Sequence, residues 1–224
     1  MLKKFFILLL VLIGMAFLFS GCITIGGNPV RGTGQVVSRS MEVGDFNSID
    51  VSGNFVVVYR QSEDRALTIA MQENLFDHLD VDTRGGTLIV GSRRGFDTTT
   101  ANRPRMYVYA PYLSAAEFSG AVNASDWDNI TVTRFSLDIS GAVNINVGLD
   151  VEYLEIDASG AANITMWGSA TNIDIDGSGA LSITAGDLEI EGGRVDISGA
   201  ANVTLSTLEN VDVRTSGVAR VRAS

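Results

Sequence analysis

Lysine, cysteine, histidine and proline are almost missing from this chain, and each shortage removes a class of protein. The single cysteine, Cys22, leaves no partner for an internal disulfide, so the fold must depend on packing and hydrogen bonds. The single histidine, His78, excludes metal sites built from several histidines. The only lysines are Lys3 and Lys4, and the formal net charge is −10, which argues against nucleic acid as a partner.

The chain also lacks the short motifs that indicate common classes of enzyme. It has no G-x-S-x-G nucleophile turn, no H-E-x-x-H metal motif and no phosphate-binding glycine loop. What it has instead is 24 glycines, only 3 prolines and many β-branched residues. This composition predicts short strands joined by tight turns, and it implies no cofactor.

The first 22 residues show the three-part pattern of a secretory signal. Lys3 and Lys4 precede an apolar run, Phe5–Phe19, that is shorter than the roughly 18 residues of a membrane span. Ser20-Gly21 before Cys22 resembles a bacterial lipobox, in which the cysteine receives a lipid such as palmitate. We therefore expect residues 1–21 to be a lipoprotein signal peptide and Cys22 to be the lipidation site. An uncleaved anchor is the alternative.

Residues 22–40 are rich in glycine and show no hydrophobic periodicity, so we expect a flexible tether to a membrane. Ile23 follows the cysteine where an aspartate would signal retention at the inner membrane, and this favours the outer membrane in an organism that has one. We expect the folded domain to occupy residues 41–224.

The tripeptide Ser-Gly-Ala recurs through the C-terminal half at intervals of 18 to 21 residues. The serines of the five copies are Ser119, Ser140, Ser159, Ser178 and Ser198, and an altered sixth copy begins at Ser216. Positions three before, three after and five after each serine are almost wholly apolar, while the positions between them are polar. Such alternation predicts two short strands around each bend, each with one buried face.

One such copy cannot bury enough apolar surface alone, whereas copies stacked side by side share a continuous interior. The sequence therefore predicts a right-handed parallel β-helix of about 20-residue coils. A less regular capping half is expected at 41–115 and regular repeats at 116–224. A β-sandwich or a propeller is the alternative.

A second pattern runs through the whole domain. Phe46 precedes Ile49-Asp50-Val51-Ser52-Gly53; Asn74-Leu75 precedes Gly86-Thr87-Leu88; and Ala110-Pro111-Tyr112-Leu113 precedes the Ser-Gly-Ala copies. Together these resemble the putative auto-transporter adhesins with a head GIN domain, over roughly residues 45–205. The resemblance implies a β-helical, exported protein with an adhesin-like role and no catalytic residues.

Three groups of polar residues are candidates for a site. Aspartates two positions before the serines, namely Asp138, Asp157, Asp176 and Asp196, predict an acidic row that could bind calcium weakly. Asparagines four positions after the serines, such as Asn123, Asn144, Asn163 and Asn202, predict a stacked amide row. The stretch from Arg84 to Arg105 holds five arginines and one acid, Asp97, which suits self-association, anionic headgroups or an exposed loop.

Paired carboxylates leave a catalytic alternative open. Asp80 and Asp82, Asp126 and Asp128, and Asp174 and Asp176 each share one strand face, a spacing that could serve glycan cleavage. We favour a non-enzymatic lipoprotein of the cell envelope with a binding surface for a glycan or another cell-surface ligand. A purely structural envelope protein is the second interpretation and a glycan-acting enzyme the third; the oligomeric state stays open.

Overall fold

The computed structural model describes residues 28–98 and 102–224, and these form strands, turns and one short 3₁₀ helix, η2 (Glu73–His78). The expected all-β class is confirmed. In chain order the strands are β1 (Val30–Arg31), β2 (Val36–Met41), β3 (Ser48–Val51), β4 (Asn54–Gln61), β5 (Ala66–Gln72), β6 (Leu79–Arg84), β7 (Thr87–Ser92), β8 (Phe96–Asp97), β9 (Arg105–Ala110), β10 (Ala115–Phe118), β11 (Ala121–Trp127), β12 (Ile130–Ile139), β13 (Ala142–Ala158), β14 (Ala161–Leu205) and β15 (Val211–Ala223).

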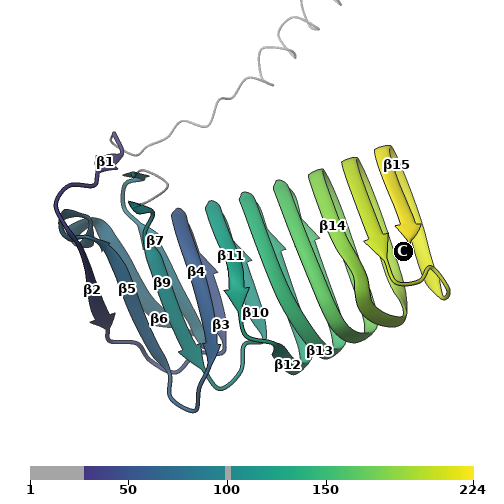
Figure 1. Cartoon of the computed structure of the whole chain (residues 1–224), viewed down its shortest axis with the longest axis horizontal. Helices are drawn as coiled ribbons and strands as arrows, with labels where there is room; N and C mark the ends of the chain where they lie inside the picture. Colours follow the sequence, from purple (N-terminus) through teal and green to yellow (C-terminus); the bar gives the residue numbers. More distant parts are fainter. Residues whose placement is uncertain (1–27, 99–101) are drawn as a thin grey trace, which may run out of the picture.

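Thirteen of these strands belong to one sheet that curls until it is nearly closed (Figure 1). One arm of the sheet runs β2-β5-β9-β4-β11-β13, and the other runs β13-β12-β10-β3-β7-β6. β13 belongs to both, because its beginning pairs with β11 and its end pairs with β12. We call these the first and second arms. β14 and β15 extend both arms beyond β13: the parts that follow each bend serine continue the first arm, and the parts that precede it continue the second.

The expected right-handed parallel β-helix is wrong, because the sheet is mixed and not wholly parallel. β2 and β9 both pair antiparallel with β5, and β6 pairs antiparallel with β7. A two-residue turn explains the last pair. Gly85 and Gly86 both have positive φ, 58° and 82°, as a tight hairpin turn with the twist of its strands requires. That glycine pair folds β6 directly back along β7.

From β10 onward the pairs are parallel, and each Ser-Gly-Ala bend lies beside the previous one. The backbone nitrogens of Ser140 and Ala142 donate hydrogen bonds of 2.9 and 2.8 Å to carbonyl groups of the preceding bend. A side chain on Gly141 would overlap the carbonyl oxygen of Gly120. The close approach of neighbouring backbones therefore explains why glycine recurs at the bend.

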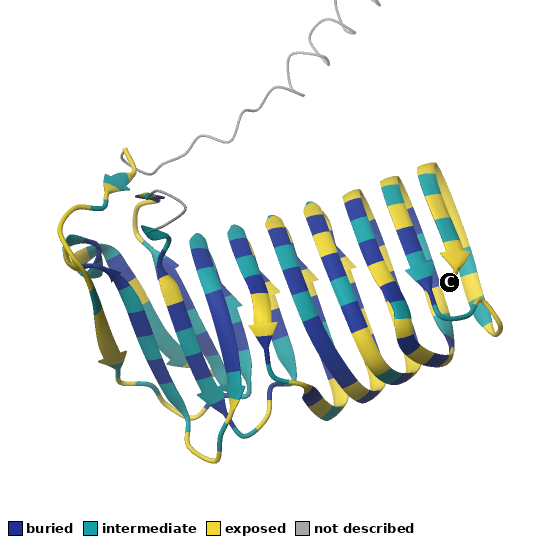
Figure 2. Cartoon of the chain, in the orientation of Figure 1, coloured by how far each residue is buried: buried dark blue, intermediate teal, exposed yellow. Residues whose placement is uncertain are grey.

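A single hydrophobic core fills the space between the two arms (Figure 2). The residues three and five positions after the bend serines point inward, as the alternation predicts; Val122, Ala124, Val143 and Ile145 are all buried. Aromatic rings fill the wider part of the core, where Trp127 packs at 5.7 Å from Tyr59 and 6.1 Å from Phe118 between ring centroids. Inward positions are thus fixed, and the alternate positions face outward.

Two strands lie in the segment for which a flexible tether is expected. β1 pairs with β8, and β2 pairs with β5 at the margin of the first arm. The side chain of Asn74 fastens the segment between them, because it accepts a hydrogen bond from the Thr33 nitrogen and donates one to the Arg31 carbonyl. Strand pairing therefore begins at Val30 rather than after residue 40.

Candidate functional site

The first arm carries an uncharged, hydrogen-bonding outer surface that we call the asparagine face. It consists of the outward positions two, four and six residues after the first five bend serines. These are Ala121, Asn123, Ser125, Ala142, Asn144, Asn146, Ala161, Asn163, Thr165, Ala180, Ser182, Thr184, Ala200, Asn202 and Thr204. Their neighbours in the chain are the inward apolar residues of the core, so strand geometry holds these side chains outward.

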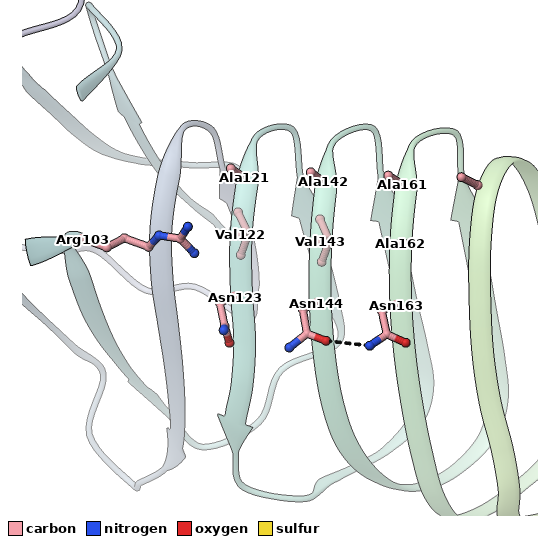
Figure 3. A pocket seen from close by; sticks show the side chains of 11 residues that line it. Arg103, Ala121, Val122, Asn123, Ala142, Val143, Asn144, Ala161, Ala162 and Asn163 are labelled. Atoms are coloured by element: carbon pink, nitrogen blue, oxygen red, sulfur yellow. Dashed lines mark hydrogen bonds between the residues drawn. The ribbon is translucent and has the colours of Figure 1, made fainter. Parts of the chain in front are cut away.

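Register places like side chains in rows across the strands of this face. Asn123 pairs with Asn144, and Asn144 with Asn163. Figure 3 shows the three asparagines in line below a row of alanines, with the Nδ2 of Asn163 donating a 3.0 Å hydrogen bond to the Oδ1 of Asn144. The row is interrupted at Asn123, whose Oδ1 accepts a hydrogen bond of 2.6 Å from the Ser125 hydroxyl instead. The alanines and asparagines line a shallow groove.

Arg103 stands at one end of this groove. Its side chain extends across β4 toward the alanine and asparagine rows (Figure 3). Among the described residues, its Nε is buried and has no hydrogen-bond partner, and the same is true of the Oδ1 of Asn54. Asn54 pairs with Ala121, so it belongs to the alanine row. Two buried polar atoms near this end of the groove therefore have no hydrogen-bond partner among the described residues.

An exposed tryptophan marks the other margin of the face. Trp167 is the next outward residue of β14 after Thr165, and 39% of its surface is exposed. It pairs with Gly148, where an added Cβ would lie 2.7 Å from the indole Nε1. The indole therefore lies over the glycine and presents a flat apolar surface beside the amides and hydroxyls. Trp127, in contrast, is buried and donates to the Val57 carbonyl at 3.0 Å.

The second arm carries an acidic row. Register joins Asp50 to Glu117, Glu117 to Asp138, Asp138 to Asp157 and Asp157 to Asp176. Partial burial, with the neighbouring charges of Asp50 and Asp138, raises the pKa of Glu117. Burial with Asp157 and Glu155 raises the pKa of Asp138, and burial raises that of Asp50. These side chains therefore carry their charge less readily than they would in water.

The calcium hypothesis gains no support from this row. Asp138, Asp157 and Asp176 stand in one line as expected, and Asp196 pairs with Arg214 at its end. Nowhere in residues 28–98 and 102–224 do three or more acidic, histidine or cysteine side chains gather in a way that could hold a metal ion. Calcium binding at the row stays an untested prediction.

Two of the three carboxylate pairs face arginines in the described structure. Arg60 lies between Asp126 and Asp128, with nitrogen–oxygen distances of 2.8 and 3.8 Å. Asp80 and Asp82 face Arg93 and Arg84, respectively. In these two pairs an arginine occupies a position beside the carboxylates that a substrate would need. His78 ends η2 two residues before Asp80, and its backbone carbonyl accepts a 3.1 Å hydrogen bond from the Arg93 nitrogen.

Cys22, the expected lipidation site, and the signal peptide 1–21 lie outside the described residues. Within the part of the chain that is described, no helix has both the length and the apolar character needed to cross a bilayer. Lipid attachment therefore remains a prediction from the leader sequence.

The model of the family described as "putative auto-transporter adhesin, head GIN domain" matches residues 45–224. The chain belongs to this family. No curated protein matches the chain in sequence. The head GIN assignment confirms the resemblance drawn from the sequence and is consistent with a protein of the cell surface or envelope.

Solved structures share the fold of this head GIN chain. A putative adhesin from Bacteroides fragilis NCTC 9343 superposes with a TM-score of 0.77 at 16% identity, covering 87% of this chain and 100% of that one. A putative lipid binding protein from Parabacteroides distasonis ATCC 8503 gives 0.62 at 16%, covering 88% and 100%. A putative adhesin from the same organism gives 0.59 at 21%, again covering 88% and 100%. At such identities the likeness shows the fold alone.

The sequence predicted the asparagine row but not the groove. Arg103 was expected in an arginine-rich loop, and nothing in its local pattern relates it to Asn123. The relation comes from the pairing of β4 with β9, which places Arg105 beside Val56 and Val56 beside Asn123. The sequence does hold one signal for the position of Arg103. The alternating pattern of Arg105–Ala110 predicts a strand, and Arg103 and Pro104 directly precede it.

Proposed function

We propose that this protein is a non-enzymatic binding protein of the cell envelope that presents the asparagine face to a surface glycan. The observation that carries the proposal is the set of amide and hydroxyl rows that the sheet holds outward on the asparagine face. Such groups both donate and accept hydrogen bonds, and so do the hydroxyls of a sugar. The exposed indole of Trp167 adds the flat apolar surface against which a sugar ring can stack.

The envelope location rests on the family and on the leader. The family is named for adhesins, and the first 22 residues predict export followed by lipid attachment at Cys22. A lipid there would tether the protein to a membrane, and a single lipid chain gives weak, reversible attachment unless a second signal supports it. The asparagine face would then be free to meet a ligand outside that membrane.

A saccharide array combined with a hydrolysis assay tests the proposal on the full-length protein. We expect binding without turnover, together with a change in the fluorescence of Trp167 as ligand covers the face. The double variant Asn144→Ala/Asn163→Ala should weaken binding about tenfold, because two hydrogen-bonding groups are lost. Asn172→Ala, an equivalent change on the second arm, is the control and should leave binding unchanged.

The other outcomes separate the alternatives. Turnover of a glycan would replace the proposal by a glycan-acting enzyme. Failure to bind any saccharide would favour a purely structural envelope protein. Binding that Asn172→Ala weakens as much as the asparagine-face variant would place the ligand elsewhere on the molecule.

A further inference from the structure

The asparagine face is bounded by arginines at both ends, although its own positions carry no charge. At one end, Arg103 reaches into the groove, and Arg105 pairs with Val56 in the asparagine row. At the other end, β15 places Arg220 beside Asn202 and Arg222 beside Thr204. The two rows that hold asparagine and threonine in β14 therefore both continue into arginine.

We propose that the ligand of this face is an acidic glycan that lies across the strands, with carboxylates at the two arginine pairs. This inference rests on the proposed function and names the class of ligand. A guanidinium group matches a carboxylate with two parallel hydrogen bonds, and an amide row between two such groups suits the neutral part of a sugar chain.

The position of Arg103 supports this choice. Its guanidinium group lies beside the alanine and asparagine rows, where a carboxylate in the groove can reach it (Figure 3). The Nε of this side chain is buried, so the terminal guanidinium nitrogens are the donors left for a ligand.

Arg222 of β15 is also held in place for such a ligand. The Nε of Arg222 donates a 3.2 Å hydrogen bond to the hydroxyl of Thr204, which directs the side chain back across the face. Seven strand spacings of about 4.8 Å separate β9 from β15, so the two arginine pairs stand roughly 34 Å apart. A pyranose ring is about as long as one strand spacing, so successive sugars of an extended chain can meet successive rows.

The net charge of −10 does not exclude an acidic ligand, because the acids are segregated. No carboxylate lines the groove, whereas the acidic row lies on the second arm, on the far side of the core. Because the two sets of side chains are exposed to solvent on opposite sides of the core, salt with a screening length of about 8 Å weakens the field of the acidic row at the groove. The nearby arginines therefore dominate the field at the face.

A pair of matched ligands tests the inference on the full-length protein at 150 mM salt. Oligogalacturonate carries one carboxylate on each sugar, and its methyl ester has the same sugars without the charge. We expect the acid to bind at least tenfold more tightly than the ester, and the difference to shrink as salt is raised. Arg103→Gln/Arg105→Gln and Arg220→Gln/Arg222→Gln should each reduce the preference about tenfold.

The control removes the same charge from the second arm. Arg134→Gln/Arg194→Gln breaks ion pairs with Glu155 and Asp196 but should keep the preference for the acid. Circular dichroism establishes that every variant is folded, and Arg105→Gln alone provides an exposed single substitution should the double variant unfold.

The outcomes distinguish this inference from the function on which it depends. Equal affinity for acid and ester would overturn the inference and leave a neutral-glycan binder. If neither the acid nor the ester binds, and no saccharide on the array binds, both the inference and the proposed function are overturned. Tighter binding to phosphatidylglycerol vesicles than to the acidic oligomer, lost in the same arginine variants, would overturn it in favour of a lipid surface.

Discussion

The amide of Asn163 donates a hydrogen bond to the amide of Asn144, across two strands that are paired in parallel. The two residues are 19 positions apart in the chain and occupy the same position in successive Ser-Gly-Ala copies. An exposed bond of this kind contributes modestly, because water competes for both groups. Its value to the protein lies in aligning the amides as a regular surface.

A double-mutant cycle measures this relationship. Asn144→Ala and Asn163→Ala should each lower the free energy of unfolding slightly, with a coupling of roughly 0.5–1 kcal/mol between them. Asn123 provides the control, because its amide oxygen accepts from Ser125 and not from the row. Asn123→Ala and Asn163→Ala should therefore be additive. Chemical denaturation of all variants gives the numbers, and additive effects for the 144/163 pair would contradict the contact.

The bend glycines predict a much larger effect. A Cβ at position 141 would overlap the carbonyl oxygen of Gly120, which is backbone and cannot rotate away. We expect Gly141→Ala to lower the free energy of unfolding by roughly 2–4 kcal/mol, because neighbouring bends must separate. Gly95→Ala is the control. The nearest atom to a Cβ added at position 95 would be the Cβ of Pro29 at 3.8 Å, which is an ordinary contact. The thermal melting temperature of this variant should therefore change little.

The sequence alone predicted which side of most strands is buried. Alternation around each serine assigned Val122, Val143 and Ile145 to the interior, and all three are buried. It also aligned Asn144 with Asn163, which the structure pairs. These predictions succeeded because a period of two residues fixes the face of a strand irrespective of how the strands are joined.

The arrangement of the N-terminal strands could not be predicted in the same way. The regular copies suggested that parallel stacking would extend back to residue 41, but the two glycines at 85 and 86 form a hairpin. β9 also inserts between β4 and β5, which are close in sequence but do not pair with each other. Such pairings depend on tertiary packing between distant segments, and so does the position of Arg103 at the groove.

The lipid anchor remains a prediction from the leader, and it can be tested without structural data. Attachment needs the thiol of Cys22, so Cys22→Ser should accumulate as an unlipidated precursor. Ser20→Ala keeps a small residue ahead of the cysteine and should still be processed. Membrane fractionation and intact-mass measurement distinguish the two. A mature wild-type protein that carries an unmodified Cys22 would refute lipid attachment.

The acidic row predicts a stability that depends on pH in an unusual direction. Glu117, Asp50 and Asp138 have raised pKa values in the folded protein, through burial and, for Glu117 and Asp138, the charges beside them. The folded state therefore binds protons more tightly than the unfolded chain does at these groups. Their contribution to stability is fully present below the ordinary values of 3.8 for aspartate and 4.5 for glutamate, and it is lost as pH rises through the folded pKa values.

Replacing the central member of the row isolates this effect. Glu117 pairs with Asp50 on one side and Asp138 on the other, so Glu117→Gln removes both like-charge contacts while keeping the shape. We expect the variant to be more stable than the wild type at pH 7, by roughly 0.2–1 kcal/mol for each contact relieved. The gain should fade as pH falls through the raised folded pKa of Glu117, and it should be gone by about pH 4.5, the ordinary value for glutamate. Glu63→Gln, an exposed change outside the row, removes the same charge and should show no such dependence. Thermal melts of the three proteins from pH 4 to 8 at constant ionic strength decide the matter, since a gain that does not vary with pH would mean that like-charge repulsion is not its cause.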